Sequence, residues 1–159
     1  MNKSQDMLSS LRILLVTVVA AFLQACAVAP IATEVQLQAG EMQVPQKQAG
    51  KTYVLLYNNA NKLLYGIDNT ARLNVWLDGK GIGGLDIGQY VQMVLPNGEH
   101  VLKLLHRDVL DFESTHRIAL NGEPLFIEMY PTPVSNSIAV HGKLPTGNDL
   151  PKPFVPYRP

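Results

Sequence analysis

Between residues 51 and 144, short runs of hydrophobic residues alternate with turn residues. The run at residues 52–57 is β-branched and aromatic and ends at an Asn-Asn pair, while residues 72–77 carry apolar side chains at alternate positions. Such side chains suit a pleated, half-buried surface, and period-two alternation places one face of a strand against a core. Both runs are therefore predicted to be strands.

Two later junctions predict hairpins. Each carries an Asn-Gly pair, Asn97-Gly98 in the first and Asn121-Gly122 in the second. An Asn-Gly pair tolerates the positive φ that a tight hairpin requires. The four flanking runs with strand character are residues 89–95, 99–106, 112–120 and 124–130. We expect these runs to form two antiparallel hairpins, and a further strand is predicted near the end of the domain, at residues 137–141.

The regular spacing of strands and turns predicts the architecture. No segment keeps a 3.6-residue apolar period beyond two turns, so long helices are not expected. Many short strands separated by turn signals are typical of a sandwich. The pattern predicts an all-β fold, an antiparallel β-sandwich of about seven strands over residues 51–144, which is the length of a single domain.

The N-terminus has the order of a secretory signal. Lys3 and Arg12 precede an apolar run at residues 13–23, which is too short to span a bilayer as a helix. The only cysteine, Cys26, follows at once. Residues 23–26 resemble the lipobox of bacterial lipoproteins, which implies a signal peptide over residues 1–25, cleavage between Ala25 and Cys26, and acylation of Cys26. An ordinary cleaved signal and a core cysteine are the alternatives.

The segments that flank the domain have the composition of connectors. Residues 26–50 are rich in Gln and lack aromatic side chains, which predicts a flexible tether. Within them, residues 34–38 alternate in polarity, and an edge strand docked on the domain is the alternative there. Residues 145–159 contain five prolines and are predicted to be an extended, non-globular tail.

The charge balance limits the kinds of partner. The chain has 13 basic and 13 acidic residues and a formal net charge of zero, so it offers no basic stripe for nucleic acid. With Cys26 acylated, neither a disulfide nor a thiolate metal site is expected. We expect no cofactor, and we expect stability to come from packing.

A glycine-rich run at residues 79–84 suggests a phosphate-binding loop. Such a loop places the phosphate at a helix N-terminus, but here the chain continues into another strand and no Gly-Lys-Ser/Thr follows. The run is instead predicted to be a β-turn or bulge. We expect Asp78, Gly79 and Gly83 to be structural turn residues.

Two histidines are the candidates for metal chemistry. His106 and His116 lie on successive predicted strands, with Asp108, Asp111 and Glu113 between them. Histidine and carboxylate ligands suit zinc and related metals, but this spacing is not diagnostic. Structural, partly buried histidines are the favoured interpretation, and no metal site is predicted.

One serine also has a histidine neighbour. Ser114 and His116 lie two positions apart on one predicted strand and so face the same way. An acyl-transfer site also needs a carboxylate that orients the base and an oxyanion hole. The sequence places neither, so no catalytic residue is predicted.

A family resemblance follows from four stretches of the domain. They are residues 52–57, 75–83, 88–91 and 95–102. Together with the lipobox and the Gln-rich segment, they resemble the lipoproteins of domain of unknown function 2846. The resemblance implies a small sandwich of the PEGA or transthyretin-like kind, in which Asn97, Gly98 and His100 shape a turn. His100 matches the family's histidine after the turn glycine, which implies a hydrogen bond to that turn.

These features lead to an expectation about the role of the protein. We expect a bacterial lipoprotein in the periplasmic leaflet of the outer membrane, since Ala27 is not the Asp that retains lipoproteins in the inner membrane. Its domain is expected to be a non-enzymatic binding or scaffolding module for an envelope protein. The alternatives are a metal-dependent periplasmic hydrolase that uses His106 and His116, and a component resembling the type VI secretion outer-membrane lipoprotein.

Overall fold

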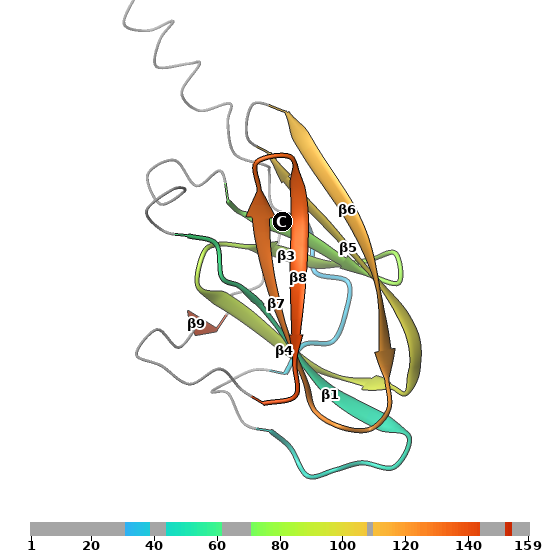
Figure 1. Ribbon diagram of the computed structural model, residues 1–159. Helices are drawn as coiled ribbons and strands as arrows, with labels where there is room; N and C mark the ends of the chain where they lie inside the picture. Colours follow the sequence, from blue (N-terminus) through green and yellow to red (C-terminus); the bar gives the residue numbers. More distant parts are fainter. Residues whose placement is uncertain (1–30, 39–43, 62–70, 108–109, 144–151, 154–159) are drawn as a thin grey trace, which may run out of the picture.

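The computed structural model describes residues 31–38, 44–61, 71–107, 110–143 and 152–153. Within these ranges the protein is all-β, with no helix, as the sequence predicts (Figure 1). The strands are β1 (Lys51–Asn58), β2 (Leu73–Leu77), β3 (Lys80–Leu85), β4 (Gln89–Pro96), β5 (Gly98–Arg107), β6 (Asp111–Leu120), β7 (Leu125–Thr132), β8 (Ser135–His141) and β9 (Lys152–Pro153).

The strands form two sheets that pack face to face. One sheet has the order β8-β7-β1-β4-β9, and the other has the order β3-β2-β5-β6. All neighbours are antiparallel except β1 with β7 and β4 with β9, which are parallel. The predicted β-sandwich is therefore confirmed.

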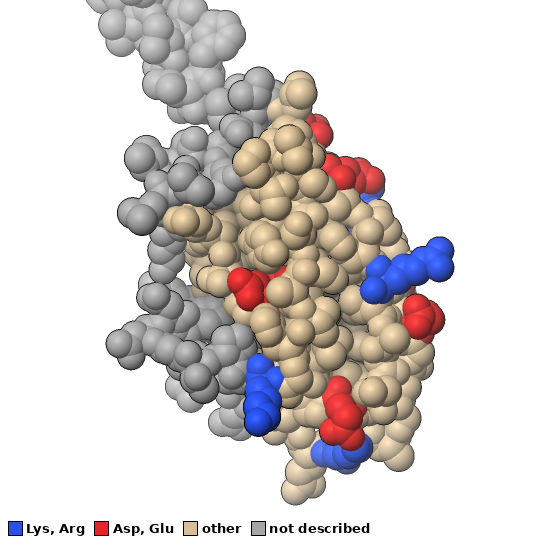
Figure 2. Space-filling model, viewed as in Figure 1, with Lys and Arg blue, Asp and Glu red and all other residues tan. Residues whose placement is uncertain are grey.

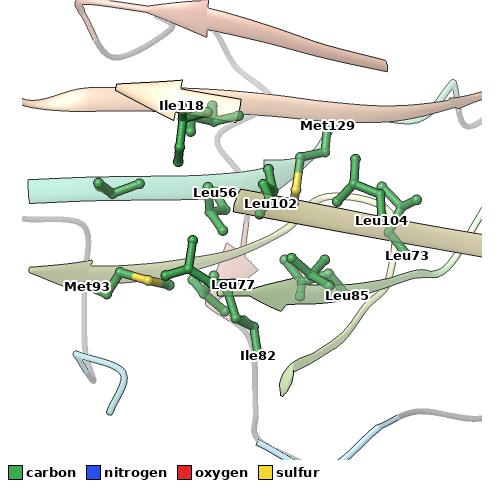
Figure 3. Close-up of a cluster of buried hydrophobic side chains, with 14 of the residues drawn as sticks. Leu56, Leu73, Leu77, Ile82, Leu85, Met93, Leu102, Leu104, Ile118 and Met129 are labelled. Carbon is green, nitrogen blue, oxygen red and sulfur yellow. The ribbon is translucent and has the colours of Figure 1, made fainter. Parts of the chain in front are cut away.

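The core lies between the two sheets (Figure 3). From one sheet, Leu56, Met93 and Met129 point inward, and they meet Leu102 and Leu104 of the other sheet. These five side chains are at most 1% exposed. Removing aliphatic side chains from water contributes about 1.5–3 kcal/mol each, so this layer is the main source of stability for the fold.

Both predicted Asn-Gly hairpins are wrong. β4 pairs with β1 and β5 pairs with β2 and β6, so the chain changes sheet at Asn97. β6 and β7 likewise lie in opposite sheets. The favoured two-residue hairpin turns require positive φ at both central positions or at the first. At these junctions only the second residue of each Asn-Gly pair has it, with φ of 134° at Gly98 and 93° at Gly122. The glycines turn the chain across the sandwich.

A single hydroxyl group joins the two junctions between the sheets. The Thr52 hydroxyl donates a hydrogen bond to Oδ1 of Asn97 at 2.9 Å and accepts one from the Gly122 amide at 2.7 Å. Thr52 is buried, and the Asn97 amide donates to the carbonyl of Gly50. The two chain crossings therefore share one end of the sandwich.

Residues 31–38 cover the open side between β3 and β4. The Glu34 amide donates to the carbonyl of Gly81 in β3, and the Gln38 amide donates to the carbonyl of Gln92 in β4. Val35 and Leu37 pack against the core. The segment is not part of a sheet, but its alternating side chains make it part of the domain, which extends beyond the predicted boundary at residue 51.

Candidate functional site

The structure describes most of the residues singled out from the sequence. Ala25, Cys26 and Asp108 lie outside the described residues. No helix in the described part of the chain is long and apolar enough to cross a membrane. Residues 80–84 of the glycine-rich run lie in β3, and Gly83 pairs with Val75 where the register of β2 and β3 shifts.

Asp78 and Gly79 form the turn between β2 and β3. Their φ values of 50° and 79° are the pair of positive angles that a tight hairpin turn needs. The Asp78 carboxylate accepts hydrogen bonds from the Val101 amide at 2.9 Å and from Nδ1 of His100 at 2.6 Å. On the other side of the ring, His100 Nε2 donates to the carbonyl of Pro96 at 2.9 Å.

Both ring nitrogens of His100 thus face acceptors. A carbonyl and an ionised carboxylate can only accept, so this arrangement suits the doubly protonated imidazolium. Burial by itself lowers the pKa of His100, but the hydrogen bonds to Asp78 and Pro96 outweigh it, and the pKa is raised. His100 therefore holds the β2–β3 turn against the junction of β4 and β5.

His106 is part of a buried polar cluster that joins the sheets at the β6–β8 side. Its ring is 1% exposed, stacks on Phe112 at 5.1 Å, and has Nδ1 2.6 Å from Oδ1 of Asn136. The Asn136 amide group donates to the carbonyls of Phe112 and Leu104. These contacts give His106 a structural role.

Ser114 and His116 do approach each other. Ser114 Oγ lies 2.9 Å from Nε2 of His116. Burial lowers the pKa of His116, and a hydrogen bond to the backbone of Asn136 opposes that effect only in part. The neighbouring carboxylate of Glu113 alternates with these side chains, so it faces the opposite side of the sheet, where it pairs with Lys103 at 2.9 Å.

The structure does not bring the two predicted histidines together. His106 pairs with Phe112 and His116 with Leu102, so they are four positions apart along the strands, about 13 Å. The Asp111 carboxylate is engaged by Arg107 at 2.5 Å. Among the described residues, no group of three or more His, Cys, Asp or Glu side chains is placed to hold a metal ion.

A second apolar cluster lies on the face of the five-stranded sheet that points away from the core. Its side chains alternate with core residues along β1, β4 and β7. We call it the tyrosine face, and it consists of Tyr53, Leu55, Tyr57, Tyr90 and Phe126, with Val94 packed against it. Tyr53 contacts Phe126 edge to face at 6.1 Å. Burial, aided by Tyr90, raises the pKa of Tyr53 to about 12.

Glu128 lies beside the tyrosine face on β7. Its Oε1 accepts a hydrogen bond from the Asn59 side chain at 2.7 Å, and its Oε2 lies 3.2 Å from the Tyr57 hydroxyl and 3.1 Å from Nε2 of His141. Burial alone raises the pKa of Glu128, but these hydrogen bonds outweigh it and lower the pKa. The carboxylate is therefore a fixed negative charge at neutral pH.

An open groove runs along β7 and β8 beside this carboxylate. Its volume is about 460 Å³. Its walls are amide, aromatic, proline and small side chains, namely Asn59, Asn61, Glu128, Tyr130, Pro131, Thr132, Pro133 and Ala139. Ala139 pairs with Glu128 across the strands, and the Glu128 side chain is 22% exposed. We call this feature the Glu128 groove.

The surface around the groove is nearly uncharged. Figure 2 shows few charged side chains over β7 and β8. Of the described residues that line the groove, Glu128 alone carries a charge. No Lys or Arg is among the described residues that line the groove, so no such cation screens the field of the Glu128 carboxylate there.

The sequence did not single out Glu128. The signal was present, because Glu128 shares its parity in β7 with Phe126 and Tyr130, which places a carboxylate on an aromatic strand face. Its three hydrogen-bond partners come from β1, from the loop after β1 and from β8. The parallel pairing of β1 with β7 brings Tyr57 and Asn59 to Glu128, and the antiparallel pairing of β7 with β8 brings His141. No local pattern predicts the parallel pairing.

Comparison with known proteins adds no further constraint. The chain matches no family model, no curated protein and no solved structure. The residues and the geometry carry the functional argument.

Proposed function

We propose that this chain is a lipid-anchored protein of the bacterial cell envelope whose β-sandwich is a non-enzymatic binding module. Cys26, directly after the apolar run of a secretory signal, is the residue that the acyl chains would modify. Two acyl chains anchor a protein stably at a membrane surface. The periplasmic leaflet of the outer membrane is the proposed location.

The Glu128 groove is the observation that carries the binding role. It combines one fixed negative charge with an aromatic ring and two prolines. A cationic side chain of a partner would pair with Glu128, stack on Tyr130 and lay its aliphatic stem along Pro131 and Pro133. We propose that the partner is an envelope protein that presents a Lys or Arg to this groove.

The arrangement of the other polar residues supports binding over catalysis. Catalysis requires a nucleophile or metal-bound water, a base and a stabilising group around one reacting atom. His106 is buried against Phe112 and Asn136, and Glu113, the carboxylate beside Ser114, faces the opposite side of the sheet and pairs with Lys103. These groups hold β5, β6 and β8 together.

Site-specific crosslinking in cells tests the proposal. A photoreactive amino acid in place of Ala139, in the groove, is expected to give one discrete crosslinked product in the membrane fraction. The matched control is the same amino acid in place of Thr115, an exposed position on β6 of the other sheet. No product from position 139, or the same product from both positions, would contradict a binding role for the groove.

A further inference from the structure

The tyrosine face is buried, although it points away from the core. Tyr53, Tyr57, Tyr90 and Phe126 are at most 5% exposed, and Leu55 is fully buried. The four-stranded sheet covers only the inner face, where the core lies. Of the described segments, residues 45–48 reach one end of the tyrosine face, beside Tyr53 and Val94. A further layer must therefore cover most of this face.

The topology identifies the segment that has to cross it. β8 ends at one edge of the five-stranded sheet, and β9, the next strand in the chain, lies at the opposite edge. His141 of β8 pairs with Phe126, whereas Lys152 and Pro153 of β9 pair with Gln89 and Tyr90. The two strands that this connection joins therefore lie at opposite edges of the sheet.

The length of that connection leaves little choice of route. The connection of residues 144–151 starts after Lys143 and ends before Lys152. Four strand spacings across the sheet and about five residue positions along the strands separate these two residues, which is about 25 Å in a straight line. Residues 144–151 span at most about 30 Å when extended. The core fills the inner face, so the short route runs over Phe126, Leu55 and Tyr90 on the outer face.

The composition of the C-terminal segment suits that surface. It contains Pro145, Pro151, Pro153, Pro156 and Pro159. Proline-rich chains favour an extended left-handed conformation, lose little entropy on docking, and are recognised by grooves lined with aromatic side chains. A face with three tyrosines and a phenylalanine offers ring surfaces to such a chain, while the hydroxyls of Tyr53 and Tyr57 are bonded to Gln92 and Glu128.

We propose that the tyrosine face is a docking surface for an extended, proline-rich peptide, and that its occupant is this chain's own C-terminal segment, residues 144–159. The parallel pairing of β9 with β4 fixes the register of the segment on the face. The surface is separate in chemistry from the Glu128 groove, because it recognises proline and backbone groups, whereas the groove recognises a cation.

Footprinting with hydroxyl radicals tests this proposal. In the full chain, Tyr53, Tyr57, Tyr90 and Phe126 are expected to be protected. In a chain that ends at Lys143, their modification should rise at least about tenfold while the sheet signal in circular dichroism is kept. A synthetic peptide of residues 144–159, added in excess, should restore protection. A peptide with its five prolines replaced by alanine should need an at least several-fold higher concentration for the same protection.

Protection that survives the truncation would overturn the proposal, because another segment would then cover the face. A dimer formed by the truncated chain, with the face protected, would assign the surface to a second copy instead. If the truncated chain does not fold, a protease site between Lys143 and Leu144 allows cleavage after folding. The cleaved fragment should then stay bound and exchange with labelled peptide, and failure to exchange would contradict docking.

Discussion

Nδ1 of His100 lies 2.6 Å from the Asp78 carboxylate. Asp78 has a φ of 50°, an unusual backbone conformation for a residue other than glycine, and it begins the tight turn between β2 and β3. His100 lies on β5, just after the chain has changed sheet. Its ring therefore ties a strained turn to the junction between the sheets.

This contact predicts a pH dependence of stability. The pKa of His100 is raised in the folded protein above its usual value of 6.5. The contribution of His100 to the free energy of unfolding is thus fully present below about pH 6.5, and it is lost as the pH rises through the pKa of His100 in the folded protein. Because Asp78 is 46% exposed, we expect a loss of no more than about 1 kcal/mol in the free energy of unfolding.

Urea unfolding at a series of pH values measures this loss. The His100→Gln variant is the control, since glutamine can still hydrogen-bond but does not titrate. Its free energy of unfolding should vary less between pH 6 and pH 8 than that of the unmodified protein. Equal pH profiles for the two proteins would show that the ion pair with Asp78 contributes nothing.

Thr52→Val should destabilise the end of the sandwich where the chain changes sheet. The substitution keeps the shape but removes the hydroxyl that bonds Asn97 and Gly122. Leaving the buried Gly122 amide without a partner costs about 1–3 kcal/mol, whereas the exposed Asn97 side chain can bond to water instead. Thr115→Val, at an exposed position of β6, should change stability by less than about 0.5 kcal/mol. Similar effects for the two variants in denaturant unfolding would refute the role assigned to Thr52.

The strand positions were predictable from the sequence, but their pairing was not. Residues 52–57, 89–95 and 112–120 have the alternation and composition of strands, and all three are strands. The Asn-Gly signals at residues 97–98 and 121–122 correctly place changes of chain direction. A turn residue fixes local φ, however, and does not specify which strand lies alongside, so both hairpin predictions failed.

The candidate groove was harder to predict for a related reason. The hydrogen bonds of Glu128 come from residues 13 to 71 positions away in the chain. The long-range parallel pairing of β7 with β1 supplies two of the three partners, Tyr57 and Asn59. Periodicity in the sequence reports only which face a side chain shares with its neighbours. The docking of residues 31–38 was visible in their alternation, but the composition of the surrounding segment favoured a tether.

Gly81→Ala should displace residues 31–38. A Cβ atom at position 81 would lie 2.5 Å from the backbone oxygen of Ala32, which is closer than nonbonded atoms tolerate. We expect a loss of about 1–3 kcal/mol and faster hydrogen exchange at the amides of Glu34 and Gln38. Gly142→Ala is the matched control, because nothing lies within 4 Å of the added carbon. Unchanged exchange in Gly81→Ala would show that the segment does not depend on this contact.

Cys26→Ser should release the protein from the membrane. Without a thiol, no acyl chain can be attached, and each buried CH₂ of such a chain contributes about 0.8 kcal/mol to membrane binding. Fractionation of cells and mass spectrometry of the N-terminal peptide measure the outcome. An unmodified protein that is already soluble in the periplasm would contradict the proposed anchor.

The most direct test of the central claim is the yield of the crosslink from position 139 when the charge of Glu128 is removed. Glu128→Gln keeps the size of the side chain and should reduce the yield at least about tenfold, because the partner's cation loses its counter-charge. Glu99→Gln, at an exposed position of β5, should leave the yield unchanged. An equal yield from the Glu128→Gln variant would show that this carboxylate does not recognise the partner.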